Sequence, residues 1–281
     1  MRLVWITDPH LDFLPPIGSV KFAEWVRKTS HAHAAVITGD IGEYPSLTNV
    51  LTLFAMAFKK PVYFVLGNHD HYRGSFEKVS QAAHIIHESE LPLFWLDKAG
   101  VVELTPDTAL VGNGGWYDAR SGNPEGSNVL MSDFTIIDDF KRLGSPEARI
   151  QKCREVSARL TEEARPVLIE AAQKYKNVYF ATHVPPFREA CWHRGKISNS
   201  DWLPWFTNLT LGAMLADVAS DHPQTQFTVL CGHTHSPGLY QHLDNLLVCT
   251  GKAEYHNPQV SRVFTLRQED QAPLSDDLPP I

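Results

Sequence analysis

The sequence of 281 residues contains no uninterrupted apolar stretch that approaches the roughly eighteen residues a membrane-spanning helix needs. The apolar run near its amino terminus, residues 3–7, stops at an acid and is too short for a secretory signal. Cysteine is scarce as well, and none of the four stands in a CxxC spacing. We therefore expect a cytoplasmic protein that makes no contact with a membrane and keeps its cysteines reduced and buried.

Positive charge is also in short supply. The chain has 25 Lys and Arg against 32 Asp and Glu, a net charge of −7, so a long nucleic-acid duplex is a poor electrostatic partner. A local basic patch can still attract a small phosphorylated ligand. With 43% hydrophobic and 20% charged residues, the composition is that of a globular domain with a sizeable core.

Apolar runs and amphipathic segments alternate in the first third of the chain. The runs have the length and continuity of buried strands, and the segments between them have helical periodicity. Strands and helices are predicted in alternation at residues 3–7, 19–30, 34–38, 46–59, 62–66 and 75–90. This order predicts a parallel sheet covered by helices.

The rest of the chain continues the α/β pattern less regularly. A long helical segment starts near Ser145 and contains Pro166, where it either kinks or gives way to a second helix. Another helix is predicted at 207–220. Further strands, the first two as parts of a meander, are predicted at 93–96, 101–104, 178–182, 227–231, 246–250 and 262–266.

No internal repeat or low-complexity linker divides the chain. We expect a single domain over residues 1–267, with an inserted loop and helical region at about 112–176 and a loop on the substrate side at about 185–206. Residues 268–281 are acidic and contain three prolines. They have the composition of a tail rather than of a core element.

Potential metal ligands stand at the carboxyl ends of five predicted strands. In open parallel sheets these ends share one crevice, so the five segments should converge. Residues two apart in an extended segment also project to the same side. The segments are Asp8-Pro9-His10, Gly39-Asp40, Gly67-Asn68-His69-Asp70, His183 and His233-Thr234-His235.

The ligand types indicate the class of metal. Imidazoles, carboxylates and an amide oxygen, without thiolate, suit divalent manganese, iron, zinc, nickel or cobalt. There are too many ligands for one ion. With a carboxylate able to bridge, they suit two divalent ions roughly 3.5–4 Å apart.

The order D-x-H, GD, GNHD, H, GHxH resembles the signature blocks of the calcineurin-like metallophosphoesterases, in the GNHD/GHxH form of the phosphodiesterase-type branch. The resemblance implies a four-layer α-β-β-α sandwich with a dinuclear metal centre. One ion would be held by Asp8, His10, Asp40 and His235. The other would be held by Asp40, Asn68, His183 and His233, with Asp40 as the bridge.

The same resemblance implies a hydrolase of phosphodiesters or phosphomonoesters, in which a metal-bridging hydroxide attacks phosphorus. His69 would act as the general acid, and Asp70 would orient its ring. The chain departs from the protein phosphatases of the superfamily, because it lacks the GDxxDRG continuation after Asp40 and carries GNHD in place of GNHE. It is closer to the phosphodiesterase, nuclease and nucleotide-hydrolase branches.

A substrate wall is predicted beside the metals, because the loop after His183 is rich in Trp and basic residues. Aromatic faces stack on bases, and guanidinium groups pair with phosphate. The alternative is that Trp202 and Trp205 anchor the core and the charges are simply solvated. The expected wall consists of Arg188, Trp192, His193 and Arg194, together with Trp116 and Tyr117 from the Gly-rich loop. Alternatively, that Gly-rich stretch is only a tight turn with a buried tryptophan.

Two other functions stay open at this point. The fold also occurs in interaction scaffolds that have lost catalysis, although every expected ligand is present here. A nuclease acting on short single-stranded nucleic acid is the other alternative, which the acidic balance disfavours. The substrate, the native metals and the oligomeric state are not determined by the sequence.

Overall fold

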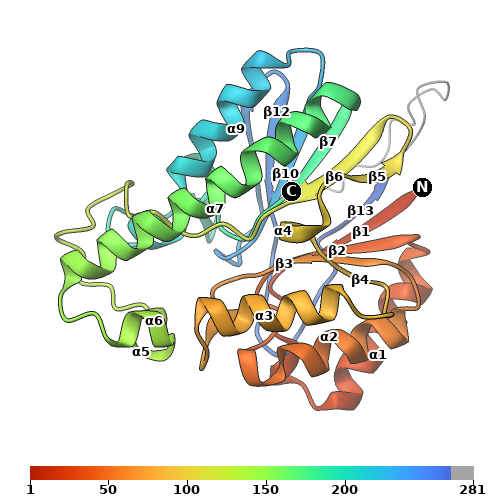
Figure 1. The fold of residues 1–281 in the computed structure, drawn as a ribbon, viewed down its shortest axis with the longest axis horizontal. Coiled ribbons are helices and arrows are strands. Elements are labelled where there is room, and N and C mark those ends of the chain that lie inside the picture. Colours follow the sequence, from red (N-terminus) through yellow and green to blue (C-terminus); the bar gives the residue numbers. More distant parts are fainter. Residues whose placement is uncertain (267–281) are drawn as a thin grey trace.

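The structure, a computed structural model, describes residues 1–266 (Figure 1). The tail expected at residues 268–281 lies outside the described residues. Two sheets lie face to face, and helices cover both outer faces. This arrangement confirms the four-layer α-β-β-α sandwich.

The first sheet has the order β13-β1-β2-β3-β4, in which β1 to β4 are parallel and β13 pairs antiparallel with β1. Its strands are β13 (Arg262–Thr265), β1 (Arg2–Ile6), β2 (Ala34–Thr38), β3 (Val62–Val65) and β4 (Leu93–Trp95).

The second sheet has the order β11-β12-β10-β7-β6-β5, with a parallel centre and an antiparallel strand at each edge. Its strands are β11 (Gly238–Leu243), β12 (Leu246–Thr250), β10 (Gln226–Cys231), β7 (Asn177–Ala181), β6 (Thr108–Gly112) and β5 (Val102–Thr105).

Five longer helices form the outer layers. α1 (Pro16–Ser30), α2 (Tyr44–Phe58) and α3 (Phe76–His87) cover the first sheet, and α7 (Pro146–Lys174) and α9 (Leu209–Asp221) cover the second. The expected serine caps are present, since Ser75 accepts a hydrogen bond from Lys78 N and Ser145 accepts one from Ala148 N.

The side chains of β1 show how the layers form. Val4 and Ile6 pack in the core beneath α1 and α2, whereas Leu3 and Trp5 pack between the two sheets. Alternate residues of a strand point to opposite faces, so a continuous apolar run fills both layers at once.

The inserted region builds a core of its own. Residues 113–132, α5 (Asp133–Ile136), α6 (Asp138–Lys141) and the first half of α7 enclose a third cluster of buried aromatic side chains. In Figure 1, α5, α6 and the start of α7 extend beyond the ends of the sheets.

Several elements differ from the sequence prediction. α7 continues through Pro166 as one helix, so the alternative of two helices is wrong, and its buried face continues from Ala164 to Leu168. Instead of forming one meander, β4 and β5 belong to different sheets, joined by the short helix α4 (Leu96–Ala99). The hairpin of β8 (Trp192–His193) and β9 (Lys196–Ile197) was not predicted.

No helix within residues 1–266 combines the length and apolar character needed to cross a membrane. The longest, α7, spans 29 residues and carries charged side chains throughout.

Candidate metal centre

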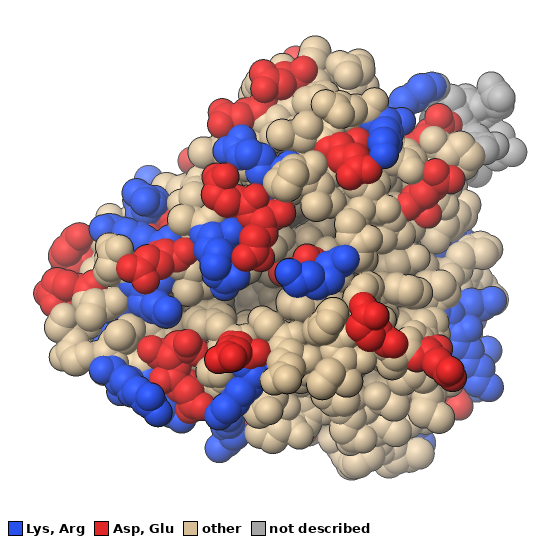
Figure 2. Space-filling model, in the orientation of Figure 1, with Lys and Arg blue, Asp and Glu red and all other residues tan. Residues whose placement is uncertain are grey.

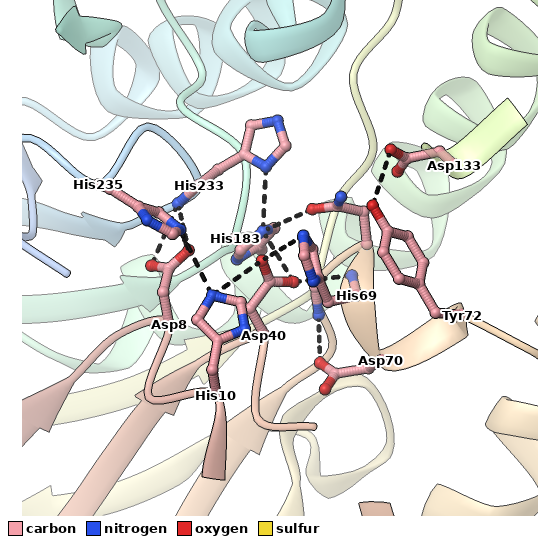
Figure 3. A network of polar contacts seen from close by, with 12 residues as sticks. Asp8, His10, Asp40, His69, Asp70, Tyr72, Asp133, His183, His233 and His235 are labelled. Carbon is pink, nitrogen blue, oxygen red and sulfur yellow. Dashed lines mark hydrogen bonds and ion pairs between the residues drawn. The ribbon is translucent and has the colours of Figure 1, made fainter. Parts of the chain in front are cut away.

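The predicted ligands converge at one end of the sandwich (Figure 3). Asp8 and His10 follow β1, Asp40 follows β2 and Asn68 follows β3. His183 follows β7, and His233 and His235 follow β10. The carboxyl ends of strands from both sheets therefore supply the site, as expected for parallel sheets.

The backbone at this site has an unusual conformation. Five ligands have φ in the left-handed region, with values of 46° at Asp8, 40° at His10, 50° at Asp40, 67° at His233 and 56° at His235. Residues other than glycine seldom adopt this conformation, and where they do, the surrounding structure has to hold them there. Such clustering is typical of a functional site.

The ligand atoms form two groups that share Asp40. In the first group, ligand atoms of Asp8, His10, Asp40 and His235 all lie within 4.8 Å of one another, and the same holds for Asp40, His183 and His233 in the second. Asn68 extends the second group, because its Oδ1 lies 3.0 Å from His183 Nε2. These are the two sets that the resemblance implied.

Main-chain carbonyls orient two of the imidazoles. His183 Nδ1 lies 2.9 Å from Thr38 O, and His233 Nε2 lies 2.9 Å from Trp205 O. A ring nitrogen that faces a carbonyl carries the hydrogen, so the opposite nitrogens, His183 Nε2 and His233 Nδ1, have free lone pairs. Those two nitrogens are 3.2 Å apart and face the centre of the site.

The electrostatics fit a cation at this position. Burial lowers the pKa of His10 to about 2 and the pKa of His233 to about 3, so both rings are neutral. Burial raises the pKa of Asp40 well above its usual value. Within residues 1–266 the ion-pair contacts of Asp8 and Asp40 are all with histidines. Buried carboxylates beside neutral imidazoles are a donor set that divalent metal ions match.

His69 lies beside the two groups without belonging to either. Its ring stacks on Tyr72 with centroids 4.3 Å apart and meets His10 edge-on at 4.8 Å. Its Nε2 is 4.0 Å from Asp40 Oδ2, and 18% of the side chain is exposed to the cavity. The ring is therefore accessible to a molecule bound at the metal ligands.

Asp70 was expected to orient the ring of His69, but its carboxylate binds main-chain amides instead. Its Oδ1 accepts hydrogen bonds from the amides of Ile41 at 2.8 Å and Gly42 at 2.9 Å, and its Oδ2 accepts one from Gly67 at 2.7 Å. Both oxygens are thus used by the main chain of two ligand-bearing loops. Tyr72 positions the His69 ring instead.

Asp133 is a buried carboxylate that the sequence did not reveal. It is fully buried, and its Oδ2 accepts a hydrogen bond from the hydroxyl of Tyr72 at 3.2 Å. Burial raises the pKa of Asp133 to about 6, and the neighbouring side chains of Asn68 and Tyr72 oppose that rise. No motif marks Asp133, because it comes from the inserted region rather than from the end of a strand.

Two adjoining cavities open at the metal ligands. The smaller, of about 230 Å³, reaches Asp40, His69 and Asp133, and the larger, of about 850 Å³, reaches His193 and Arg194. Both are lined by Trp202, Phe206, His233, His235 and Tyr255.

The predicted substrate wall is only partly present. His193 and Arg194 line the larger cavity. Arg188 is exposed on the short helix η3 (Arg188–Ala190), outside the lining of that cavity. Trp192 is half-buried and packs so closely on Gly238 that an added Cβ there would lie 2.1 Å from its Nε1. It therefore anchors the hairpin.

The structure contradicts a place for Trp116 and Tyr117 in the substrate wall and agrees with the alternative of a buried tryptophan. They are 2% and 0% exposed and pack among Phe134, Phe140 and Trp205 in the core of the inserted region. The Gly-rich sequence around them gave the appearance of a surface loop, but the inserted helices cover it.

The aromatic residues that do face the cavities were missed. Tyr255 lies 4.6 Å from His10 and 4.9 Å from His235 between ring centroids, and Phe206 lies 4.4 Å from His233. Trp202 packs on Phe206 at 5.4 Å. The metal ligands are thus bordered by aromatic rings on two sides. Trp202 stood in the predicted loop, whereas nothing near Tyr255 in the sequence marked it.

Comparison with known proteins gives a consistent result. Residues 1–237 match the model of the calcineurin-like phosphoesterase family. No curated protein matches the chain significantly.

Among solved structures, a phosphopantetheinyl hydrolase from Mycobacterium tuberculosis is similar with a TM-score of 0.67 and 16% identity, over 96% of this chain and 98% of that one. A dimetal phosphatase from Danio rerio has a TM-score of 0.55 and 14% identity, over 90% and 87%. A protein from Thermus thermophilus has a TM-score of 0.53 and 14% identity, over 89% and 88%. At these identities the likeness shows a common fold.

Proposed function

We propose that this chain, which belongs to the calcineurin-like phosphoesterase family, hydrolyses a small phosphodiester at a centre of two divalent metal ions. The family membership supports the general activity, the hydrolysis of phosphoric esters. The observation that carries this proposal is the shared position of Asp40 between the two ligand groups. A carboxylate with one oxygen toward each group can serve two ions at once. Bound there, divalent ions would supply a nucleophile at neutral pH and neutralise the charge of the phosphoryl group.

Asp8, His10 and His235 would complete the first ion's ligands, and Asn68, His183 and His233 those of the second. The fixed tautomers of His183 and His233 favour this assignment, because their free nitrogens already face the shared carboxylate. Asp70 contributes indirectly, since it holds the loops that carry Asp40 and Asn68.

His69 is proposed to donate a proton to the leaving oxygen. Burial lowers the pKa of His69 to about 3, so the ring is neutral before a ligand binds. An anionic phosphate beside the ring favours its charged form and raises that pKa. Substrate binding therefore prepares the acid, and Tyr72 keeps the ring against the cavity.

A diester is favoured over a monoester by the space around the site. The cavity of about 850 Å³ beside the ligands has the size of a pocket for a small organic molecule. A phosphodiester carries an organic group on both sides of phosphorus, and the two adjoining cavities can accept one group each.

The test begins with protein stripped by a chelator and assayed on bis(p-nitrophenyl) phosphate and p-nitrophenyl phosphate. Manganese, iron, zinc, nickel and cobalt are then restored separately. We expect turnover with at least one metal, with the diester preferred. His69→Gln should lower kcat about 10²–10⁴-fold, the usual contribution of general acid catalysis, without loss of bound metal.

His84→Gln, on the exposed face of α3, is the matched control and should keep the wild-type kcat. Two ions bound without turnover on either ester would favour the scaffold alternative. An unchanged kcat in His69→Gln on a diester with an alcohol leaving group, which unlike p-nitrophenolate needs a proton to depart, would exclude the acid role.

A further inference from the structure

The larger cavity is lined by two basic side chains and by no acid. Arg194 and Lys196 contribute to its wall, and none of the described residues that line it is Asp or Glu. Arg194 and Lys196 are exposed and make no ion pair that the structure shows within residues 1–266. This is notable in a chain with a net charge of −7.

A groove elsewhere on the molecule shows the contrast. Figure 2 shows a hollow between α3 and α7 with charges of both signs around it. The groove there is lined by Glu77, Asp139 and Glu155 as well as Lys152 and Arg159, so every base in it has an acid nearby. The cations beside the metal ligands have no such compensation.

The hairpin that carries the cations is fixed to the loop of metal ligands. The amide of Arg194 donates a hydrogen bond of 3.1 Å to Ser236 Oγ, and Ser236 directly follows His235. The indole of Trp192 packs against Gly238 a little further along the same segment. The cationic tip therefore has a defined position relative to the metal ligands.

The turn between β8 and β9 has an unusual residue at its first central position. Arg194 and Gly195 have φ of 49° and 75°, as in a two-residue hairpin turn with both central residues left-handed. Asn, Asp or Gly is the usual first residue of such a turn. Arginine at this strained position does not favour folding of the turn, so we attribute its presence to a ligand that its guanidinium binds.

We propose that the hairpin forms a second anion subsite, in which Arg194 and Lys196 bind a phosphate that the substrate carries in addition to the scissile one. This inference rests on the proposed function and deepens it. Metal ions at the centre would neutralise the scissile phosphate, so a second phosphate needs cations of its own. The exposed rings of Trp202 and Tyr255, each 44% exposed, flank the same cavity and suit a planar group between the two phosphates.

A matched pair of substrates tests the subsite. p-Nitrophenyl thymidine 5′-phosphate and its 3′-phosphorylated form share the scissile bond and the leaving group and differ by one phosphate. We expect kcat/KM to be about tenfold to a hundredfold higher for the 3′-phosphorylated form. This is the gain that a hydrogen bond to a charged group usually contributes. The double variant Arg194→Ala/Lys196→Ala should reduce that ratio to near one.

Lys21→Ala/Lys60→Ala removes two exposed lysines on other elements and is the control for net charge. It should keep the wild-type ratio. A wild-type ratio near one, or a ratio that the Arg194/Lys196 variant leaves unchanged, would overturn the subsite. Hydrolysis of both substrates would at the same time uphold the proposed function.

A binding measurement separates the two proposals if neither diester is hydrolysed. Calorimetric titration with thymidine 5′-monophosphate, 5′-diphosphate and 3′,5′-bisphosphate reports the second phosphate without turnover. We expect one of the two doubly phosphorylated ligands to bind about tenfold tighter than the monophosphate, and that gain to disappear in Arg194→Ala/Lys196→Ala. The ligand that responds identifies whether the second phosphate is adjacent or remote. Equal affinities for all three would overturn the inference.

Discussion

Individual residues behind the ligands decide how well the second ligand group is prepared for a metal ion. His183 and His233 are oriented by carbonyls of Thr38 and Trp205, which fix the tautomers before any ion binds. For Asn68, the structure shows no such carbonyl contact within residues 1–266. Its amide instead lies near the carboxylate of Asp133, whose pKa it helps to hold down, so a residue from the inserted region supports Asn68.

We expect Asp133→Asn to weaken metal binding about 10–100-fold, the usual effect of changing a residue that supports a metal ligand from outside the ligand set. The change keeps the size of the side chain but removes the negative charge beside Asn68 and replaces one carboxylate oxygen with a donor NH2 group. Titration of manganese or zinc into the stripped protein measures the affinity without relying on activity.

Tyr72→Phe is the companion variant, because it removes the hydroxyl that Asp133 accepts while keeping the ring that stacks on His69. Its metal affinity should lie closer to wild type. If Asp133→Asn bound metal as tightly as the wild type, Asp133 would have only a packing role.

At the scale of elements, the sequence predicted best what continuous apolar runs encode. The strand expected at 246–250 coincides with β12, and the first three strands and helices lie within a few residues of their predicted bounds. A strand that is apolar on both faces is stable only between two covering layers. The polar residues that follow such a strand therefore lie at its carboxyl end, outside the core. The convergence of the ligands followed from this alone.

The loops that cover the site could not be predicted in the same way. The hairpin at 192–197 pairs only two residues on each strand, too few for a recognisable pattern. Tyr255 and Asp133 reach the site only because of where distant loops pack, and no local periodicity encodes that. The error for Trp116 had the same origin, since a Gly-rich loop is exposed only until another segment covers it.

Helix α4 holds a carboxylate that makes stability depend on pH. Asp97 accepts a hydrogen bond from Gly114 N at 3.3 Å through Oδ1, while its Oδ2 is buried without a hydrogen-bond partner in the described structure. Burial raises the pKa of Asp97 from 3.8 to about 7. The folded state therefore binds this proton more tightly than the unfolded chain, and stability is lost as the pH rises through about 7.

Asp97→Asn should be more stable than the wild type above that pH. Asparagine keeps an oxygen for Gly114 N and never ionises, so the gain in unfolding free energy should reach roughly 2–4 kcal/mol at pH 8.5 and vanish near pH 4. Urea unfolding at both pH values measures it. Asp244→Asn, at an exposed position, should leave the stability at both pH values unchanged. A gain for Asp97→Asn that did not grow with pH would point to a cause other than this ionisation.

For the whole molecule, the metal centre lies where the two sheets meet. Asp8, Asp40 and Asn68 follow strands of the first sheet, whereas His183 and His233 follow strands of the second. The apolar layer between the sheets holds them together along the strands, but at this end the contacts are polar and the carboxylates are buried. Cations bound here would join the sheets at an end where polar ligand side chains from both sheets meet.

Removal of metal should therefore destabilise the entire fold rather than one loop. Ligands that bind only the folded state stabilise it by about 2.7 kcal/mol at a hundred times their Kd, which for a domain of this size corresponds to a Tm increase of roughly 5–10 °C. We expect a chelator to lower Tm by that amount in a single transition, and added metal to restore it.

Asp40→Asn should abolish most of the metal-dependent shift in Tm, because Asp40 belongs to both ligand groups. His84→Gln should preserve it. Equal Tm values with and without metal would mean that the apolar layer alone holds the sheets together. The negative charge of the buried carboxylates would then be neutralised by protons in the free protein, and metal would add no stability.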